Sequence, residues 1–69
     1  MPLTMVKEGE LNTIKRIGGK EATRRFLENL GFVTGGTVTV VSAVGGNLIV
    51  NVKDARVAIG RDMANKILV

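Results

Sequence analysis

Hydrophobic residues recur with helical spacing in one stretch of the chain and with strand spacing in most of the rest. After Gly18-Gly19, apolar residues stand at positions 22, 26, 27 and 30, which places them on one face of a helix. Gly31 follows directly, and glycine commonly ends a helix because it adopts the left-handed conformation without strain. We therefore predict one amphipathic helix in this stretch, with Phe32 folding back onto its last turn.

Most other segments read as short strands joined by turns. Residues 37–42, 48–52 and 55–59 are rich in β-branched and small apolar residues, and we expect turns at Thr34-Gly35-Gly36, Gly45-Gly46 and Lys53-Asp54. Residues 2–6 are predicted to form an edge strand. Residues 11–17 are predicted to form a twisted or bulged strand, because their apolar residues recur every third position. Residues 61–67 are expected to form one or two helical turns, and 68–69 a last strand residue or two.

Together these elements predict a single, mainly β domain spanning residues 1–69. Short strands joined by glycine turns favour a small closed or nearly closed barrel, since closure removes exposed strand edges. We expect about five strands, one inserted α-helix and a short C-terminal helical turn. The predicted core comprises Phe26, Leu27, Leu30, Val38, Val50 and Ile59.

The residue types present argue against an enzyme. The chain has no cysteine and no histidine, so disulfides, thiolate metal sites and histidine general bases are excluded. The carboxylates are scattered over turns and the helix, so no catalytic pair is expected. No cofactor is required. Glu8 and Glu10, which flank Gly9, leave open a weak site for a divalent cation, although a polar turn is the simpler interpretation.

The net charge of the chain indicates which classes of partner it could bind. Ten Lys and Arg against six Asp and Glu give a formal net charge of +4, which favours anionic partners, although it also simply promotes solubility. Nucleic acid is not expected, because single-strand-binding barrels stack bases on aromatic residues and this chain has no Tyr or Trp. The first residues form neither a signal peptide nor a membrane span, because charges begin at Lys7, and the lack of cysteine fits the cytoplasm.

The polar face of the predicted helix is the best candidate surface for a partner. Glu21/Arg25 and Arg24/Glu28 have the spacing of helical ion pairs. Two adjacent arginines cannot pair identically with the same neighbour, so one guanidinium could bind an external carboxylate or phosphate. The alternative is that both are occupied in surface pairs of little energetic value. The predicted contact surface comprises Lys20, Arg24, Arg25 and Glu28, extended by Arg61.

In the order of its segments, the whole chain resembles the FeoA family. The matching positions are Gly9-Glu10, Ile14, Ile17-Gly18-Gly19, the run Arg24-Arg25-Phe26-Leu27-Glu28-Asn29-Leu30-Gly31-Phe32, Gly35, Val38, Gly45-Gly46, Leu48-Ile49-Val50, Ala58-Ile59, Arg61, Ala64 and Ile67. Two positions depart from the family pattern: Thr34 stands where the family often has Pro, and Phe26 where it usually has Leu.

The resemblance implies an SH3-like barrel and a non-enzymatic, cytoplasmic adaptor in bacterial ferrous iron uptake. The implied partner is FeoB, a membrane ferrous iron transporter that carries a cytosolic G-protein domain. Without His or Cys the chain is a poor iron carrier, which favours an adaptor over a metallochaperone. Three alternatives stay open: a small basic nucleic-acid-binding barrel, a free-standing regulatory domain like that of iron-dependent repressors, and weak self-association.

Overall fold

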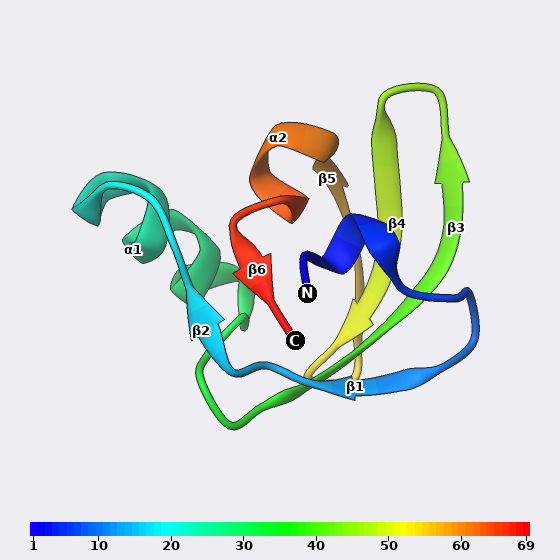
Figure 1. Ribbon diagram of the computed structural model, residues 1–69, viewed down its shortest axis with the longest axis horizontal. Helices are drawn as coiled ribbons and strands as arrows, with labels where there is room; N and C mark the ends of the chain where they lie inside the picture. Colours follow the sequence, from blue (N-terminus) through cyan, green and yellow to red (C-terminus); the bar gives the residue numbers. More distant parts are fainter.

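The computed structural model describes residues 1–69 as two small antiparallel sheets around a shared core, with helix α1 projecting to one side (Figure 1). One sheet has four strands in the order β1-β3-β4-β5, and the other pairs β2 with β6. The elements in chain order are η1 (Leu3–Met5), β1 (Leu11–Thr13), β2 (Arg16–Ile17), α1 (Glu21–Leu30), β3 (Thr37–Val44), β4 (Asn47–Val52), β5 (Ala55–Gly60), α2 (Arg61–Ala64) and β6 (Ile67–Leu68).

The β3–β4–β5 meander follows from local turn chemistry. Val44 pairs with Asn47, so Gly45-Gly46 alone connects β3 to β4, and Gly45 has a φ of 60°. Lys53 and Asp54 connect β4 to β5 with φ angles of 46° and 61°. Both connections are two-residue hairpins of the kind that match the twist of paired strands. The three predicted strands and their turns are confirmed.

One irregularity interrupts the pairing of β3 with β4. The register moves from Val40 opposite Val50 to Ser42 opposite Ile49, so Val41 is an extra residue on β3. Such a bulge bends its strand and increases the local twist. From the sequence we predicted a twisted or bulged strand at a different place, in residues 11–17.

Residues 11–17 do not form one continuous strand. β1 pairs with β3, whereas β2 pairs with β6, so the segment crosses from one sheet to the other. At the crossing, the Ile14 N–H donates to the Gly36 carbonyl and the Ile14 carbonyl accepts from the Gly35 N–H, both at 2.8 Å. The three-residue apolar period therefore marks this corner, and the prediction of a single strand is wrong.

The N-terminal segment is also not the predicted edge strand. Leu3–Met5 form a 3₁₀ turn, closed by the Met5 N–H donating to the Pro2 carbonyl at 3.0 Å. The turn directs Leu3 into the core, where it is completely buried, and leaves Met5 70% exposed. Only Pro2 forms a bridge, with Leu68.

The core is wholly apolar. No polar or charged side chain is buried, and the largest buried side chain is Phe32. The buried apolar residues are Leu3, Ile14, Ile17, Leu27, Phe32, Val38, Val40, Leu48, Val50, Val52, Ile59, Ala64 and Ile67. Of the predicted core, Leu27, Val38, Val50 and Ile59 are confirmed, and Leu30 packs against the cluster.

Phe26 is the exception among the predicted core residues. Its side chain is 49% exposed, and Ala22, one turn earlier, is exposed as well. Helix α1 instead turns Thr23, Leu27 and Leu30 inward. Positions 23, 27 and 30 share one helical face, and positions 22, 26, 27 and 30 share another that overlaps it. The apolar pattern alone therefore could not decide which face of α1 is turned toward the core. The mainly β class, the inserted helix and the short C-terminal helix are confirmed, with six strands instead of about five.

Candidate functional site

Helix α1 carries most of the predicted contact surface, and its ends are fixed by glycines. Gly19 has a φ of 92° and precedes the helix, while Gly31 has a φ of 110° and ends it. The Gly31 N–H donates to the Glu28 carbonyl at 2.9 Å, and the Phe32 N–H donates to the Leu27 carbonyl at 3.0 Å. These two bonds form a Schellman cap, in which the residue after glycine packs back on the helix. The predicted helix stop is confirmed.

The α1 arc consists of Lys20, the N-cap of the helix, with Arg24, Arg25 and Glu28 on the helix, and all four are exposed. Arg25 pairs with Glu21 through an Nη2–Oε1 distance of 2.8 Å, and both side chains are at least 70% exposed. Such a solvated pair contributes less than about 1 kcal/mol, so a partner can displace it at little cost. Glu21 therefore positions the Arg25 guanidinium but leaves it available to a partner.

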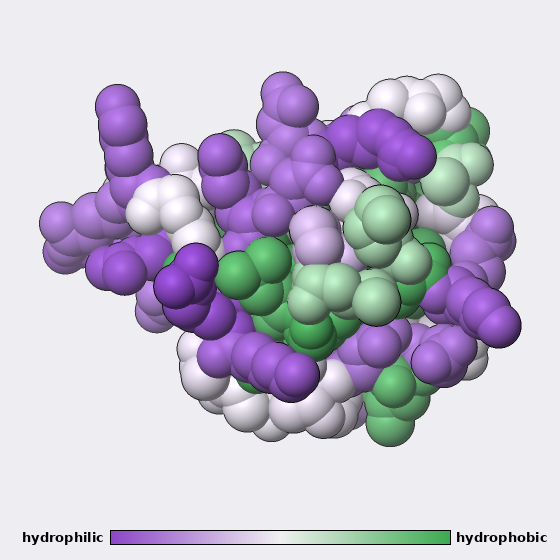
Figure 2. Space-filling model, in the orientation of Figure 1, coloured by the Kyte–Doolittle hydropathy of each residue, from purple (hydrophilic) through white to green (hydrophobic).

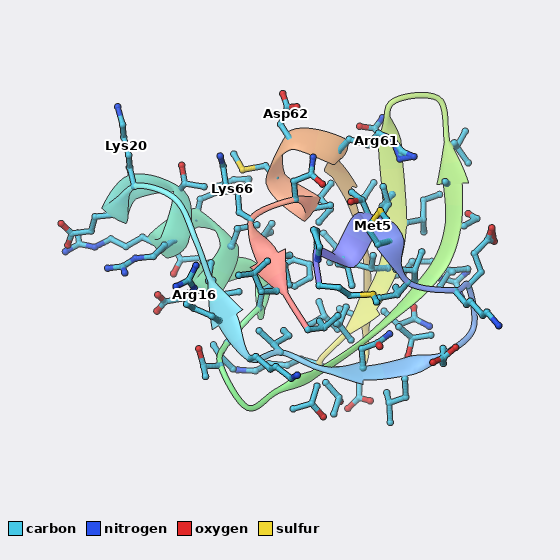
Figure 3. The ribbon with its side chains drawn as sticks, in the orientation of Figure 1. Met5, Arg16, Lys20, Arg61, Asp62 and Lys66 are labelled. Carbon is cyan, nitrogen blue, oxygen red and sulfur yellow. The ribbon has the colours of Figure 1, made fainter.

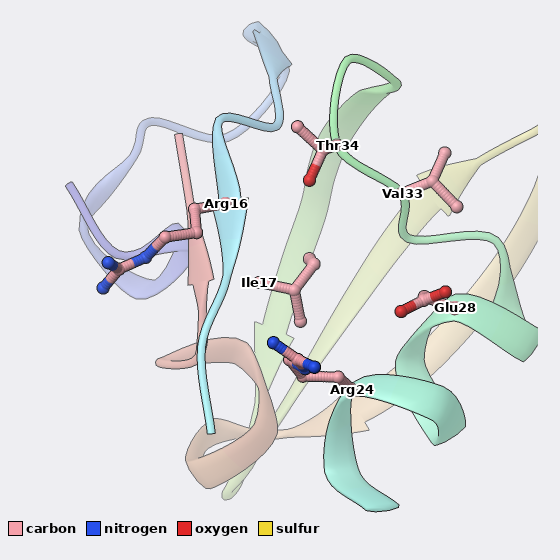
Figure 4. Close-up of a pocket in the computed structure, with 6 residues that line it drawn as sticks. All are labelled: Arg16, Ile17, Arg24, Glu28, Val33 and Thr34. Carbon is pink, nitrogen blue, oxygen red and sulfur yellow. The ribbon is translucent and has the colours of Figure 1, made fainter. Parts of the chain in front are cut away.

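The second predicted pair on the arc does not form. The Arg25–Glu21 bridge is the one ion pair between side chains, so Arg24 and Glu28 stay unpaired. Both line a cleft of about 440 Å³ between α1, β2 and the loop before β3, together with Arg16, Ile17, Val33 and Thr34 (Figure 4). In Figure 4, Arg24 points toward Ile17, whereas the guanidinium of Arg16 points away from the helix. The cleft thus offers one free guanidinium beside one free carboxylate.

Arg61 lies apart from this surface. It begins α2 and its N–H donates to the Gly46 carbonyl at 2.9 Å, next to the β3–β4 turn. Figure 3 shows Lys20 and Arg61 on opposite sides of the molecule in that view. The structure brings Arg24, Arg25 and Glu28 together on α1, with Lys20 at its N-cap, but does not bring Arg61 to them.

Sequence reasoning missed Arg16 and Thr34 as neighbours of the helix. Arg16 precedes a buried isoleucine on β2, so its exposure follows from strand alternation. Its position beside α1 depends on the crossing of residues 11–17 between the sheets, which has no local signal. Thr34 lines the cleft from the turn closed by the Gly36 N–H and the Val33 carbonyl at 3.0 Å.

This surface presents charged hydrogen-bond donors and acceptors. No group of three or more His, Cys, Asp or Glu side chains converges anywhere in the structure. Arginine at an exposed site offers planar paired donors for carboxylates or phosphates, and Glu28 offers an acceptor for a complementary cation. No helix of the chain has both the length and the apolar character needed to cross a membrane.

Known proteins resemble this chain over nearly its whole length. A candidate Fe(2+) transport protein A of Methanocaldococcus jannaschii is 34% identical over 68 residues, which cover 99% of this chain and 83% of that protein. A crystal structure of an iron uptake regulatory protein, FeoA, superposes with a TM-score of 0.89 at 26% identity and covers 97% of this chain and 91% of its own. The FeoA of Stenotrophomonas maltophilia, complexed with zinc, gives a TM-score of 0.84 at 26% identity, covering 99% and 87%.

The fold resemblance extends to regulators. A manganese-dependent transcriptional repressor superposes with a TM-score of 0.87 at 21% identity, over 97% of this chain but 39% of the repressor. The S. maltophilia protein is described as an SH3 domain protein, which confirms the expected SH3-like barrel. The FeoA domain family matches residues 1–69 without a gap at either end. This chain therefore belongs to the FeoA family, whose members are associated with ferrous iron transport.

Proposed function

We propose that this protein is a non-enzymatic adaptor of ferrous iron uptake that contacts the cytosolic G-protein domain of a FeoB-type membrane transporter from the cytoplasm. The S. maltophilia relative is described as a candidate activating factor of bacterial ferrous iron transport, which supports a role beside the transporter. The absence of His and Cys from this chain favours binding to the transporter over carriage of iron.

The observation that carries the proposal is the unpaired charge on α1. Lys20, Arg24 and Glu28 are exposed and form no ion pair, and the pairing of Arg25 is weak. A helix needs only its inner stripe to hold it to the barrel, and here Thr23, Leu27 and Leu30 form that stripe. The outer arc is free to meet another protein without disturbing the core.

The mixed charge of the arc fits a protein surface better than a small anion. Arg24 and Glu28 lie one helical turn apart and line the same cleft. A partner that presents a carboxylate to Arg24 and a basic group to Glu28 satisfies both, whereas a lone phosphate would be repelled by the glutamate. Charge-assisted hydrogen bonds of this kind fix register and partner choice across an interface.

Isothermal titration calorimetry with the soluble G domain of the cognate transporter tests the proposal. The protein is titrated into the G domain loaded with GDP and, separately, with a non-hydrolysable GTP analogue. Binding in either state supports an adaptor, and a difference between the states supports regulation by nucleotide. Absence of binding in both states contradicts the proposed contact.

A charge-reversal pair locates the surface. R24E/R25E should weaken G-domain binding by about tenfold or more, because two guanidinium contacts become repulsive. K15E/K66E is the matched control, because it changes net charge equally but lies outside the α1 arc. Equal loss in both variants would indicate an effect of total charge and would remove the arc from the proposal.

A further inference from the structure

A patch of exposed apolar side chains surrounds the two ends of the chain. Met1 and Met5 are 65% and 70% exposed, and with the half-buried Val6 and Val69 they form the apolar part of a depression of about 390 Å³. Lys7, Glu10 and Asn12 line its polar side. Figure 2 shows hydrophobic side chains gathered over the middle of this face, with hydrophilic ones around them. The ends are held together here, because the Val69 N–H donates to the Met1 carbonyl at 2.8 Å.

Beside this patch runs a basic strip, Lys15, Arg16 and Lys66, which lies in two segments bordered by Glu10, Glu21 and Asp62. Segments 11–20 and 63–69 contain Lys15, Arg16, Lys20 and Lys66 and no Asp or Glu. The β2–β6 pairing brings the two segments side by side, with Arg16 opposite Leu68. All four basic side chains are exposed and none forms an ion pair. In Figure 3, Arg16 and Lys66 lie on the α1 side of β6, and Met5 lies on the other side, at η1.

We propose that this face, defined by Met1, Met5, Val6 and Val69 with the basic strip Lys15, Arg16 and Lys66, binds an anionic lipid surface. Proteins that lie on membranes without crossing them combine exposed apolar side chains with Lys and Arg, which attract acidic headgroups. The inference rests on the proposed function, which places the protein beside a membrane transporter. It adds that the barrel touches the bilayer with its terminal face while α1 stays free for the G domain.

Three other occupants fit the observations less well. In a symmetric pair of copies each patch would meet itself, so the basic strips would approach one another and repel. Nucleic acid would use the charges but leave the methionines without stacking partners. An acidic protein would need a shaped apolar site, whereas Met1 and Met5 are largely exposed and the depression between them is shallow.

Sedimentation with large unilamellar vesicles tests the proposal on the full chain. We expect binding to vesicles of phosphatidylcholine mixed with phosphatidylglycerol, weakened by added salt, and little binding to phosphatidylcholine alone. K15E/K66E should lower the partition coefficient by roughly tenfold or more, because two attractive charges become repulsive. R24E/R25E, which changes net charge equally, should leave most of the binding intact.

The apolar part is tested by a second matched pair. Met5→Ser should lower the partition coefficient several-fold, whereas Leu11→Ser should not. Leu11 is 68% exposed but lies on the opposite side of β1, where it lines a different depression with Thr37 and Thr39. Circular dichroism of each variant confirms that it is folded.

The outcomes separate this inference from the adaptor role. G-domain binding that K15E/K66E leaves unchanged, together with vesicle binding that it abolishes, supports both. G-domain binding without vesicle binding overturns the lipid inference alone. Vesicle binding without G-domain binding overturns only the proposed partner. Equal loss of vesicle binding in the two charge-reversal variants would indicate bulk charge and overturn the assigned face.

Discussion

The β3–β4–β5 meander and helix α1 differ in how much of their side-chain surface is buried. The meander buries more of it, and α1 is mostly exposed to solvent. In the meander, Val38, Val40, Leu48, Val50, Val52 and Ile59 are all at most 4% exposed, and each strand is hydrogen-bonded along its length. In the ten-residue helix, Leu27 is the only buried side chain. The meander therefore supplies much of the buried apolar surface. Helix α1 contacts the core through three residues, and its other side chains, many of them charged, are exposed to solvent.

This contrast predicts that stability and partner binding respond to different substitutions. Burial of apolar area is the main favourable term in folding, so changes in the core should lower the free energy of unfolding. Exposed charges contribute little to that free energy, so changes on the α1 arc should leave it nearly unchanged. The same substitution made at a buried position and at an exposed position tests this prediction.

The two phenylalanines offer the sharpest test. Phe32→Ala should lower the free energy of unfolding by about 3–5 kcal/mol, because the side chain is completely buried. Phe26→Ala should cost less than about 1 kcal/mol, because that side chain is half exposed. Urea unfolding followed by circular dichroism measures both. Similar losses for the two variants would mean that Phe26 is packed as deeply as Phe32.

The glycine that ends α1 should give the next largest effect. Gly31→Ala forces an alanine to a φ of 110° and should cost about 1–2 kcal/mol. Gly46→Ala is the matched control, because its added Cβ would meet no atom within 4 Å and its φ is not left-handed. Thermal unfolding compares the two, and equal midpoints would show that the α1 cap is not strained by a side chain.

The β4–β5 turn should be open to improvement. Lys53 and Asp54 both have positive φ, which costs most residues free energy but suits Asn-Gly. The double substitution Lys53→Asn and Asp54→Gly should therefore raise the free energy of unfolding by about 0.5–1 kcal/mol. Urea unfolding measures the change. A loss of stability would show that Lys53, whose side chain lies near Gly31, contributes more through that contact than its strain costs.

The smallest change in stability is expected for the exposed residues of α1. Arg25→Ala removes the one ion pair between side chains and should cost at most about 0.5 kcal/mol at low salt. The difference from the wild type should shrink as salt is added, because the pair is solvated. A cost above about 1 kcal/mol that persists at high salt would mean that Arg25 stabilises the fold by packing.

The sequence was sufficient where structure is local. The hairpins and the helix end are set by the backbone conformation of Gly45-Gly46, Lys53-Asp54 and Gly31, all of which were predicted from local sequence. It was insufficient where two distant segments meet. The crossing at Ile14 depends on hydrogen bonds to Gly35 and Gly36, and the burial of Leu3 depends on the closing of the barrel ends.

The candidate site shows the same limit. Membership of Arg24, Arg25 and Glu28 in one exposed helical arc follows from spacing, so it could be predicted. Neither the approach of Arg16 to this arc nor the separation of Arg61 from it could be, because both depend on how β2 and α2 lie on the barrel. The rotation of α1 that exposes Phe26 is likewise decided by packing.

The measurement that tests the central claim most directly pairs stability with affinity in the R24E/R25E variant. Urea unfolding and calorimetric titration with the transporter's G domain are performed on the same preparation. We predict a free energy of unfolding within about 1 kcal/mol of the wild type and an affinity reduced by about tenfold or more. An unchanged affinity in the folded variant would contradict the assignment of α1 as the contact surface.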